Sequence, residues 1–500
     1  MRLHGAVGLV IAVATAIGAG DEPEGEKRPA VSVRLTRPDQ ELHDLLALFE
    51  GARAPSPAAA LAAWKLRTGK TLGKPAEAMI ALLNPEMVRD LRTLDGAEAL
   101  VAFDADGRAH GSATIPRDDG TFAALATALA LTDGAAEEPI GAAAVDRLGR
   151  PGSWLMARRG AAMVLAPDRD DLRRALDPPR IDPARQRDPG CSFEVEPAGL
   201  AAARSLPVRR LGEALRGLGC RRLEGVLRIE QDTFSLSLTS RLADSPLGRR
   251  RIAPEWLGWV PADRAIGAIA MAIDPEPEAL AAAFDAADGV IHADPAKGRV
   301  APLRGRLAVL ALAAGVRLET EFWPALLGVS AAALKNPDDR DPPGLVVALH
   351  TDGDANARRI AERVLPRLAT FGRLKEFQPD PQRPFEPVRR ILGRPLAVAR
   401  RGSTVWVGWG EGVLEACLGD PRAGRSALDL FRPSWGPRPP QRAGLLWPGR
   451  WPALDSSGMV DAPPVLWWGS RDGDTARDEI RWAGLHPFVV RVVDRVVTGE

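Results

Sequence analysis

The chain has 500 residues, of which 45% are hydrophobic and 26% are charged, an ordinary balance for about two to four globular domains. It carries 66 basic and 65 acidic side chains, for a net charge of +1. This near-neutrality argues against a dedicated nucleic-acid-binding protein, which usually has a clear basic excess.

The first twenty residues differ in character from the rest of the chain. Arg2 precedes a run without a charge, 6–19, and small residues follow. This pattern predicts a secretory signal peptide over 1–20, removed after Gly18 or Gly20. The alternative, a membrane anchor, needs about 20 apolar residues, and no later segment is long and apolar enough to span a bilayer. We therefore expect an exported protein, periplasmic or extracellular, whose mature chain has no membrane span.

An N-terminal extension and helical lead-in is expected over 21–95. Apolar periodicity predicts helices over 55–66 and 75–94. The stretch RTGKTLGK between them is similar to a phosphate-binding loop. However, Trp64 stands where that loop has its first glycine, and a helix precedes the stretch instead of a strand. We expect a helix–turn–helix connection there.

Two α+β units, 96–180 and 344–431, share a plan. Each contains the letters LGRP followed by ARRG, which ends at Gly160 in the first copy and at Gly402 in the second. Upstream, ALVAFDADG of the first copy aligns with LVVALHTDG of the second. Self-similarity of this kind indicates duplication of one supersecondary unit.

The predicted order within each copy is strand, helix, hairpin, helix. The first helix covers 121–131 in one copy and 357–371 in the other. In the hairpin, the glycine after the two arginines supplies the positive φ of a tight turn. In the first copy the closing helix begins after Asp168 or Asp170, which are both good N-cap residues.

The paired arginines of the repeated phrase are candidates for a binding role. Arg158 and Arg159 lie at the hairpin tip of the first copy, and Arg400 and Arg401 lie at that of the second. A solvated hairpin tip explains them without any function. If the two copies pack face to face, these four residues would frame one shared groove.

The remaining segments are a middle α+β domain, 191–335, and a Trp- and Pro-rich C-terminal region, 432–500. In the middle domain, alternation on both sides of Gln231 predicts a hairpin, and 315–322 alternates as well. The C-terminal region has a hairpin candidate around Gly473. The overall class is α+β, with duplicated strand–helix–hairpin–helix units that form antiparallel sheets covered by helices.

Three cysteines, Cys191, Cys220 and Cys417, are too few for a disulfide framework. A single Cys191–Cys220 bridge is allowed in an oxidising compartment. The alternative is three buried thiols that act as small hydrophobic side chains. Cys417 aligns with Ala175 of the first copy, which favours packing over nucleophilic catalysis.

Familiar catalytic and metal-binding motifs are missing from the sequence. The six histidines have no metal-ligand spacing, and no Gly-x-Ser-x-Gly elbow occurs. The stretch 352–356, DGDAN, begins like a calcium loop, but Ala357 and Arg363 replace the glycine and glutamate that the motif requires. An acidic turn ahead of a helix N-terminus explains the same residues. We predict no catalytic residues, no metal and no cofactor.

Tryptophan is concentrated after residue 400. Trp447 and Trp451 lie in the Pro-rich stretch WPGRWP and are the best candidates for exposed side chains that stack on sugars. Core packing is the alternative for tryptophans on strands, such as those of TVWVGW.

The stretches LNPEMVRDLRTLDGAEALVAFD and DDGTFAALATALALTDG and the two LGRP…ARRG stretches carry a resemblance. The chain resembles the uncharacterised secreted repeat-containing proteins of planctomycete-type bacteria, which have no assigned activity. The resemblance implies export and repeated α+β units, and it supplies no site residues.

The leading hypothesis is a non-enzymatic binding or scaffold protein of the cell envelope or periplasm, whose partner is an unidentified protein or envelope component. The second is a carbohydrate- or cell-wall-binding module, which requires Trp447 and Trp451 to be solvent-exposed. The third is an exported hydrolase with dispersed carboxylates. A fold by itself does not decide among them.

Overall fold

The chain divides into two compact units in a computed structural model. Unit 1 comprises Met1–Arg216, Cys220–Ser240 and Trp482–Glu500, and unit 2 comprises Gly217–Gly219 and Arg241–Arg481. The structure describes residues 29–36, 38–70, 97–103, 109–116, 135–147, 155–159, 162–166, 168–176, 190–204, 206–217, 219–242, 250–274, 303–313, 315–336, 342–365, 389–391, 393–419, 426–432, 435, 439–450 and 462–499. The predicted signal peptide and the predicted helices 75–94 and 121–131 lie outside these ranges.

Unit 1 is built on an antiparallel sheet with the strand order β4-β5-β6-β7-β3-β2-β1-β8-β9-β10. The strands are β1 (Pro29–Thr36), β2 (Ala97–Phe103), β3 (Ala109–Pro116), β4 (Ala135–Ile140), β5 (Ala143–Arg147), β6 (Leu155–Arg159), β7 (Ala162–Ala166), β8 (Gly190–Val195), β9 (Cys220–Glu230) and β10 (Thr233–Leu242). The helices are α2 (Pro38–Ala47), α3 (Pro57–Thr68), α7 (Arg169–Leu176), α8 (Pro197–Ala201), α9 (Leu206–Gly217) and α17 (Leu485–Thr498).

Local sequence signals account for several of these elements. Ser56 caps α3 by accepting a hydrogen bond from the amide of Ala59, and Gly69 ends the helix at φ 64°. The carboxylate of Asp168 accepts from the amide of Asp171 and caps α7, as predicted. The predicted hairpin is formed by β9 and β10, with Gln231 in the left-handed region at its turn.

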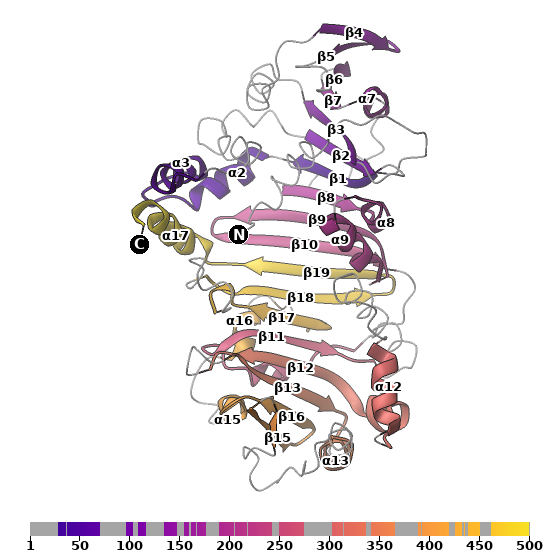
Figure 1. Ribbon diagram of the computed structural model, residues 1–500, viewed down its shortest axis with the longest axis vertical. Coiled ribbons are helices and arrows are strands. Elements are labelled where there is room, and N and C mark those ends of the chain that lie inside the picture. Colours follow the sequence, from indigo (N-terminus) through magenta and orange to yellow (C-terminus); the bar gives the residue numbers. More distant parts are fainter. Residues whose placement is uncertain are drawn as a thin grey trace. The chain divides into compact units, whose positions relative to one another are not determined.

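Unit 2 is also built on antiparallel sheet structure, with the strand order β14-β15-β16-β13-β12-β11-β17-β18-β19 (Figure 1). Its strands are β11 (Ala265–Ala272), β12 (Leu326–Leu334), β13 (Gly344–Thr351), β14 (Arg389–Ile391), β15 (Arg394–Arg401), β16 (Thr404–Trp409), β17 (Arg442–Leu446), β18 (Val465–Asp472) and β19 (Thr475–Trp482). Its helices and helical turns are α10 (Glu255–Gly258), α12 (Leu303–Ala313), η4 (Leu318–Phe322), η5 (Trp323–Ala325), α13 (Asp354–Arg359), η6 (Ile360–Val364), α15 (Val413–Leu418), α16 (Ala427–Phe431) and η7 (Pro448–Arg450).

Different helices pack on the two faces of this sheet. On one face, small side chains of the strands, such as Ala268, Ala332 and Ala399, pack with residues of α10, α15 and α16. On the other face, β15 and β16 pack with α13 and η6. Short side chains on the first face leave room for the large indole of Trp256 from α10, which lies against Gly328.

Once β4 is set aside, the described strands of the two units have the same order when they are counted along the chain. β5 corresponds to β14, the hairpin β6–β7 to β15–β16, β3-β2-β1 to β13-β12-β11, and β8-β9-β10 to β17-β18-β19. This order matches β13 with β3, whereas the sequence alignment placed it on β2. The α+β class with antiparallel sheets is confirmed, and the duplication stays a prediction that the equal orders support.

The structure differs from the sequence pattern at several places in the segment 191–335. The segment 191–335, predicted as a middle domain, contributes residues to both units. The alternating stretch 315–322 is not a strand, because Leu318–Phe322 forms a π-helical turn. Cys191 and Cys220 do not form a disulfide. Cys191 faces Leu227 in the β8–β9 register, roughly 20 Å along the strand from Cys220, which is far beyond bridging distance.

Candidate functional site

The paired arginines end hairpin strands in both units. Arg158 and Arg159 end β6 of unit 1, and Arg158 is exposed. Arg400 and Arg401 end β15 of unit 2, and Gly402 takes φ 52° in the turn that follows, as predicted. Because the two pairs belong to different units, the shared groove stays a prediction.

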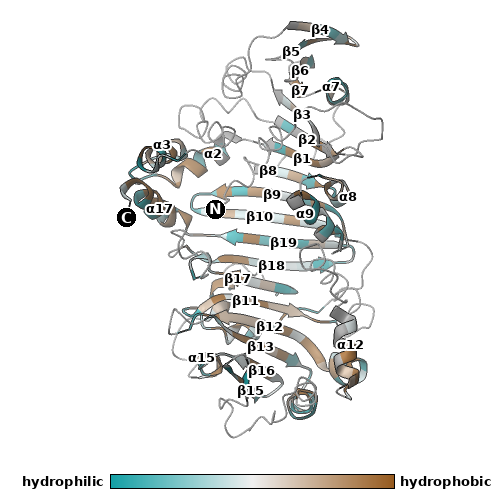
Figure 2. Ribbon diagram, in the orientation of Figure 1, coloured by the Kyte–Doolittle hydropathy of each residue, from teal (hydrophilic) through white to brown (hydrophobic). Residues whose placement is uncertain are grey.

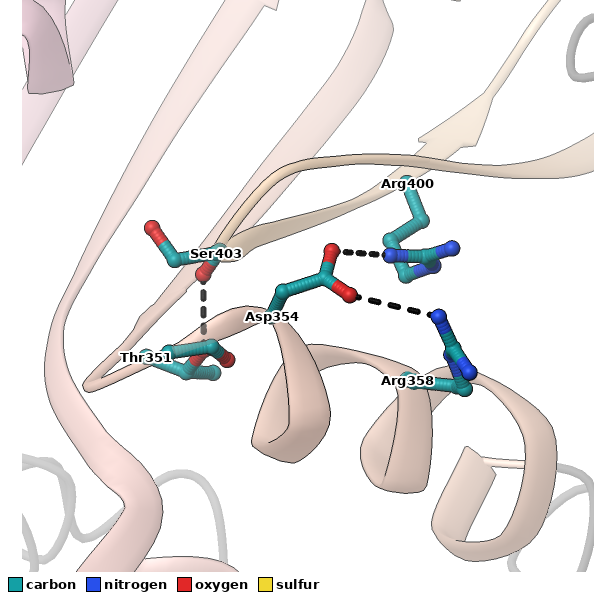
Figure 3. A network of polar contacts seen from close by, with 6 residues as sticks. Thr351, Asp354, Arg358, Arg400 and Ser403 are labelled. Atoms are coloured by element: carbon teal, nitrogen blue, oxygen red, sulfur yellow. Dashed lines mark hydrogen bonds and ion pairs between the residues drawn. The ribbon is translucent and has the colours of Figure 1, made fainter.

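Arg400 belongs to a small polar network that joins its hairpin to α13 (Figure 3). The carboxylate of Asp354 accepts a hydrogen bond from Arg400 and forms an ion pair with Arg358 at 3.4 Å. Beside it, the Thr351 hydroxyl donates to the carbonyl oxygen of Ser403 at 2.7 Å. These contacts hold the hairpin turn against the first turn of α13.

The same network explains the acidic stretch that begins like a calcium loop. The Asp352 carboxylate accepts from Asn356, and Asp354 faces two guanidinium groups. In the described ranges, no group of three or more His, Cys, Asp or Glu side chains is arranged to hold a metal ion. The interpretation as an acidic turn ahead of a helix N-terminus agrees with this geometry.

The Asp354 network should contribute little to stability. Because Asp354 is 51% exposed, we expect Asp354→Asn to lower the free energy of unfolding of unit 2 by less than about 1 kcal/mol. Urea unfolding at low and at molar salt measures this, and the difference should shrink as salt screens the pair. A loss of several kcal/mol that salt does not change would contradict the assignment.

Trp447, a candidate for sugar binding, is buried instead of exposed. It is 8% exposed, and the guanidinium of Arg450 lies 4.2 Å from the centroid of its ring. Arg450 also donates to the carbonyl oxygens of Ala262 and Ala265 at 2.5 and 2.8 Å, which fixes it over the indole. The carbohydrate hypothesis requires Trp447 to be solvent-exposed, and that prediction is wrong. Trp451 lies outside the described residues.

Unit 2 contains a serine–histidine pair and a cysteine of the residue types that serve as nucleophiles. Ser330 and His350 are 2.8 Å apart, a distance suited to a nucleophile and its base. Ser330 is 0% exposed and His350 is 4% exposed, so no substrate reaches them. Burial raises the pKa of the Cys417 thiol to about 12, which keeps it protonated and unreactive at neutral pH.

The feature of unit 2 that suits binding is one face of its sheet, which we call the apolar face. Four large apolar side chains project from it and remain exposed: Ile269 at 50%, Met271 at 49%, Leu345 at 45% and Leu446 at 38%. Single exposed hydrophobic residues are common on soluble proteins, whereas a cluster indicates an interaction site.

Strand register places these four residues in neighbouring rows across the sheet. The rows run from β13 through β12, β11 and β17 to β18, with strands about 4.8 Å apart. They are Leu345-Ala333-Gly267-Leu446-Val465, Val347-Ala331-Ile269-Gly444-Trp467 and Leu349-Val329-Met271-Arg442-Gly469. Figure 2 shows the same strands, β11 to β13, in hydrophobic colours.

One polar pair and one indole border the apolar face. Arg442 donates two hydrogen bonds to Asp478 of β19, at 2.8 and 2.6 Å, so the charges are mutually satisfied. Trp467 lies against Gly444, where a Cβ atom would come within 2.8 Å of its ring. Glycine at this position leaves room for the indole, which lies in the same row as Ile269 and extends the apolar surface.

No protein-family model and no curated protein matches this chain. Among solved structures, crystal form I of TP0453 is 8% identical, with a TM-score of 0.23, over 48% of this chain and 81% of that chain. Crystal form III of TP0453 is 10% identical, with a TM-score of 0.24, over 48% and 82%. These scores are too low to support an inference about function.

Proposed function

We propose that this chain is an exported, non-enzymatic binding protein, and that the apolar face of unit 2 binds an apolar or amphipathic partner of the cell envelope. The observation that carries the proposal is the row arrangement of Ile269, Met271, Leu345 and Leu446. Covering the exposed part of each side chain would contribute on the order of 1 kcal/mol. Contact with the half-buried residues beside them would add to this.

Two further observations support a binding role over catalysis. The serine–histidine pair with nucleophile geometry is enclosed in the core. The arginines at the hairpin of unit 2 are engaged in a structural network or exposed at its tip.

Within the described ranges, no helix is both long and apolar enough to cross a membrane.

Removing exposed side chains from the apolar face should weaken binding of a hydrophobic probe. We expect the double variant Ile269→Ser/Met271→Ser to lower the fluorescence of added anilinonaphthalene sulfonate, because both residues lie at the centre of the rows. The matched control is Leu66→Ser on α3, which is 88% exposed but belongs to unit 1. Equal fluorescence for all three proteins would remove the basis of the proposal.

Export has a separate test. The intact mass of the protein recovered from its native cells should correspond to a chain that begins at residue 19 or 21, after removal of the signal peptide. An unprocessed chain found in the cytoplasm would contradict export and leave the apolar-face measurement unaffected.

A further inference from the structure

A series of hydrogen bonds runs through the core of unit 2, from Trp259, the residue that follows α10, to three strands. The Trp259 indole N–H donates to the Ser330 hydroxyl at 3.1 Å. Ser330 Oγ lies 2.8 Å from Nε2 of His350, and Nδ1 of His350 lies 3.2 Å from the Thr404 hydroxyl. These bonds therefore connect the C-terminal end of α10 with β12, β13 and β16.

A neutral imidazole matches the two hydroxyl groups that flank it. One ring nitrogen carries the proton and donates to its hydroxyl partner, and the other nitrogen accepts a proton from the second hydroxyl. In an imidazolium both ring nitrogens donate, so the hydroxyl that had donated to the ring loses that acceptor. Protonation of His350 therefore removes one hydrogen bond from the core and adds a buried charge.

Burial of His350 disfavours its charged form, although an indole lies against the ring. Trp256 of α10 stacks on the imidazole, with ring centroids 4.5 Å apart and planes 2° from parallel. A cation is attracted to the face of an indole, but burial opposes it by removing the water that would solvate the charge. Burial prevails and lowers the pKa of His350 from 6.5 to about 3.

Charged residues on the neighbouring elements do not offset this burial. Glu255 lies on α10 and Arg250 precedes it, Arg401 ends β15 beside Thr404, and Asp352 follows β13. All four side chains are exposed. Facing the imidazole, β12 presents Ser330, β16 presents Thr404 and α10 presents the indole of Trp256, which are all uncharged groups.

We propose that His350 is an acid-sensitive latch: it holds α10 against the sheet of unit 2 at neutral pH and releases it when the imidazole is protonated. Because folding lowers the pKa of His350, the unfolded or opened chain takes up the proton first. The stabilisation is complete above pH 6.5 and is lost as the pH falls from 6.5 towards 3. Over that range the equilibrium constant for opening rises about tenfold per pH unit.

The test compares wild type with His350→Gln and with the control His486→Gln. Glutamine retains a donor and an acceptor without titrating, and His486 is a half-exposed histidine on α17 of unit 1. The urea midpoint of unit 2 is measured from pH 7.5 to pH 4. As the pH falls, the free energy of unfolding should decrease more steeply for wild type and His486→Gln than for His350→Gln. The difference between the slopes should correspond to the uptake of one proton on unfolding. Parallel pH profiles of all three would overturn the proposal.

Two measurements on wild type keep the test decisive if His350→Gln does not fold. The NMR signal of the His350 ring should remain that of a neutral imidazole at pH 5 in the folded protein, and a midpoint near 6.5 would overturn the latch. Hydrogen exchange, corrected for its intrinsic pH dependence, should accelerate on acidification at Glu255–Gly258 more than at α7 of unit 1. Equal changes in both helices would rule out release of α10.

Discussion

Phe431→Ala should lower the free energy of unfolding of unit 2 by about 4 kcal/mol. Phe431 lies on α16, is 0% exposed and contacts Trp435 with ring centroids 5.2 Å apart. Removing its ring leaves a cavity in the core that α10, α15 and α16 share with the sheet. Denaturation in urea, followed by circular dichroism, measures the loss as a shift in the transition of unit 2.

The matched control for Phe431→Ala is Leu312→Ala on α12. Leu312 is 81% exposed, so its removal opens no cavity, and alanine favours a helix at least as well. We expect a change within about 0.5 kcal/mol for this variant. If Phe431→Ala lowered the free energy of unfolding by no more than the control does, Phe431 would not be a core residue.

Gly328→Ala should cost about 3 kcal/mol, at the upper end for overpacking of a core. A Cβ atom on Gly328 would lie 2.1 Å from the ring of Trp256 and 2.6 Å from the carbonyl oxygen of Met271. Neither group can move freely, because the oxygen belongs to the sheet backbone and the indole is stacked on His350. The variant should therefore disturb the near-UV circular dichroism of Trp256 as well as stability.

Gly353→Ala provides the control for an added methyl group. No atom lies within 4 Å of the position of its Cβ, and φ is 172°, an extended conformation that any residue adopts. We expect little change in the unfolding midpoint. An unchanged midpoint and spectrum for Gly328→Ala would contradict the packing of Trp256 on this glycine.

Local signals in the sequence were sufficient for hairpins and caps. The β15–β16 turn followed from Gly402, the β18–β19 turn from Gly473, and the start of α7 from Asp168. Each signal depends on residues within a few positions of one another. The division into two units could not be predicted, because the pairing of β1 with β8 joins residues such as Val31 and Val195.

The apolar face could not be predicted from an alternation of polar and apolar residues. In β11, residues on both faces are apolar, and the large side chains of Ile269 and Met271 are exposed while Ala268 and Ala270 are buried. The sequence signal that distinguishes the two faces is the size of the side chains. The face that packs against indoles has room only for small residues such as alanine, and the bulky residues lie on the other face. The core position of His350 depends on Ser330, Thr404 and α10, which are distant in sequence.

The strand order of both units affects how the chain can fold while it is made. β1 is translated first in its sheet, yet one of its edges stays unpaired until β8 emerges, and β11 waits in the same way for β17. At roughly 5–20 residues per second, this delay is on the order of ten seconds for each unit. Sheet completion is therefore a late, long-range event. Each unit therefore stays open for about that time during synthesis, a state that a translocation channel for unfolded polypeptides can accept.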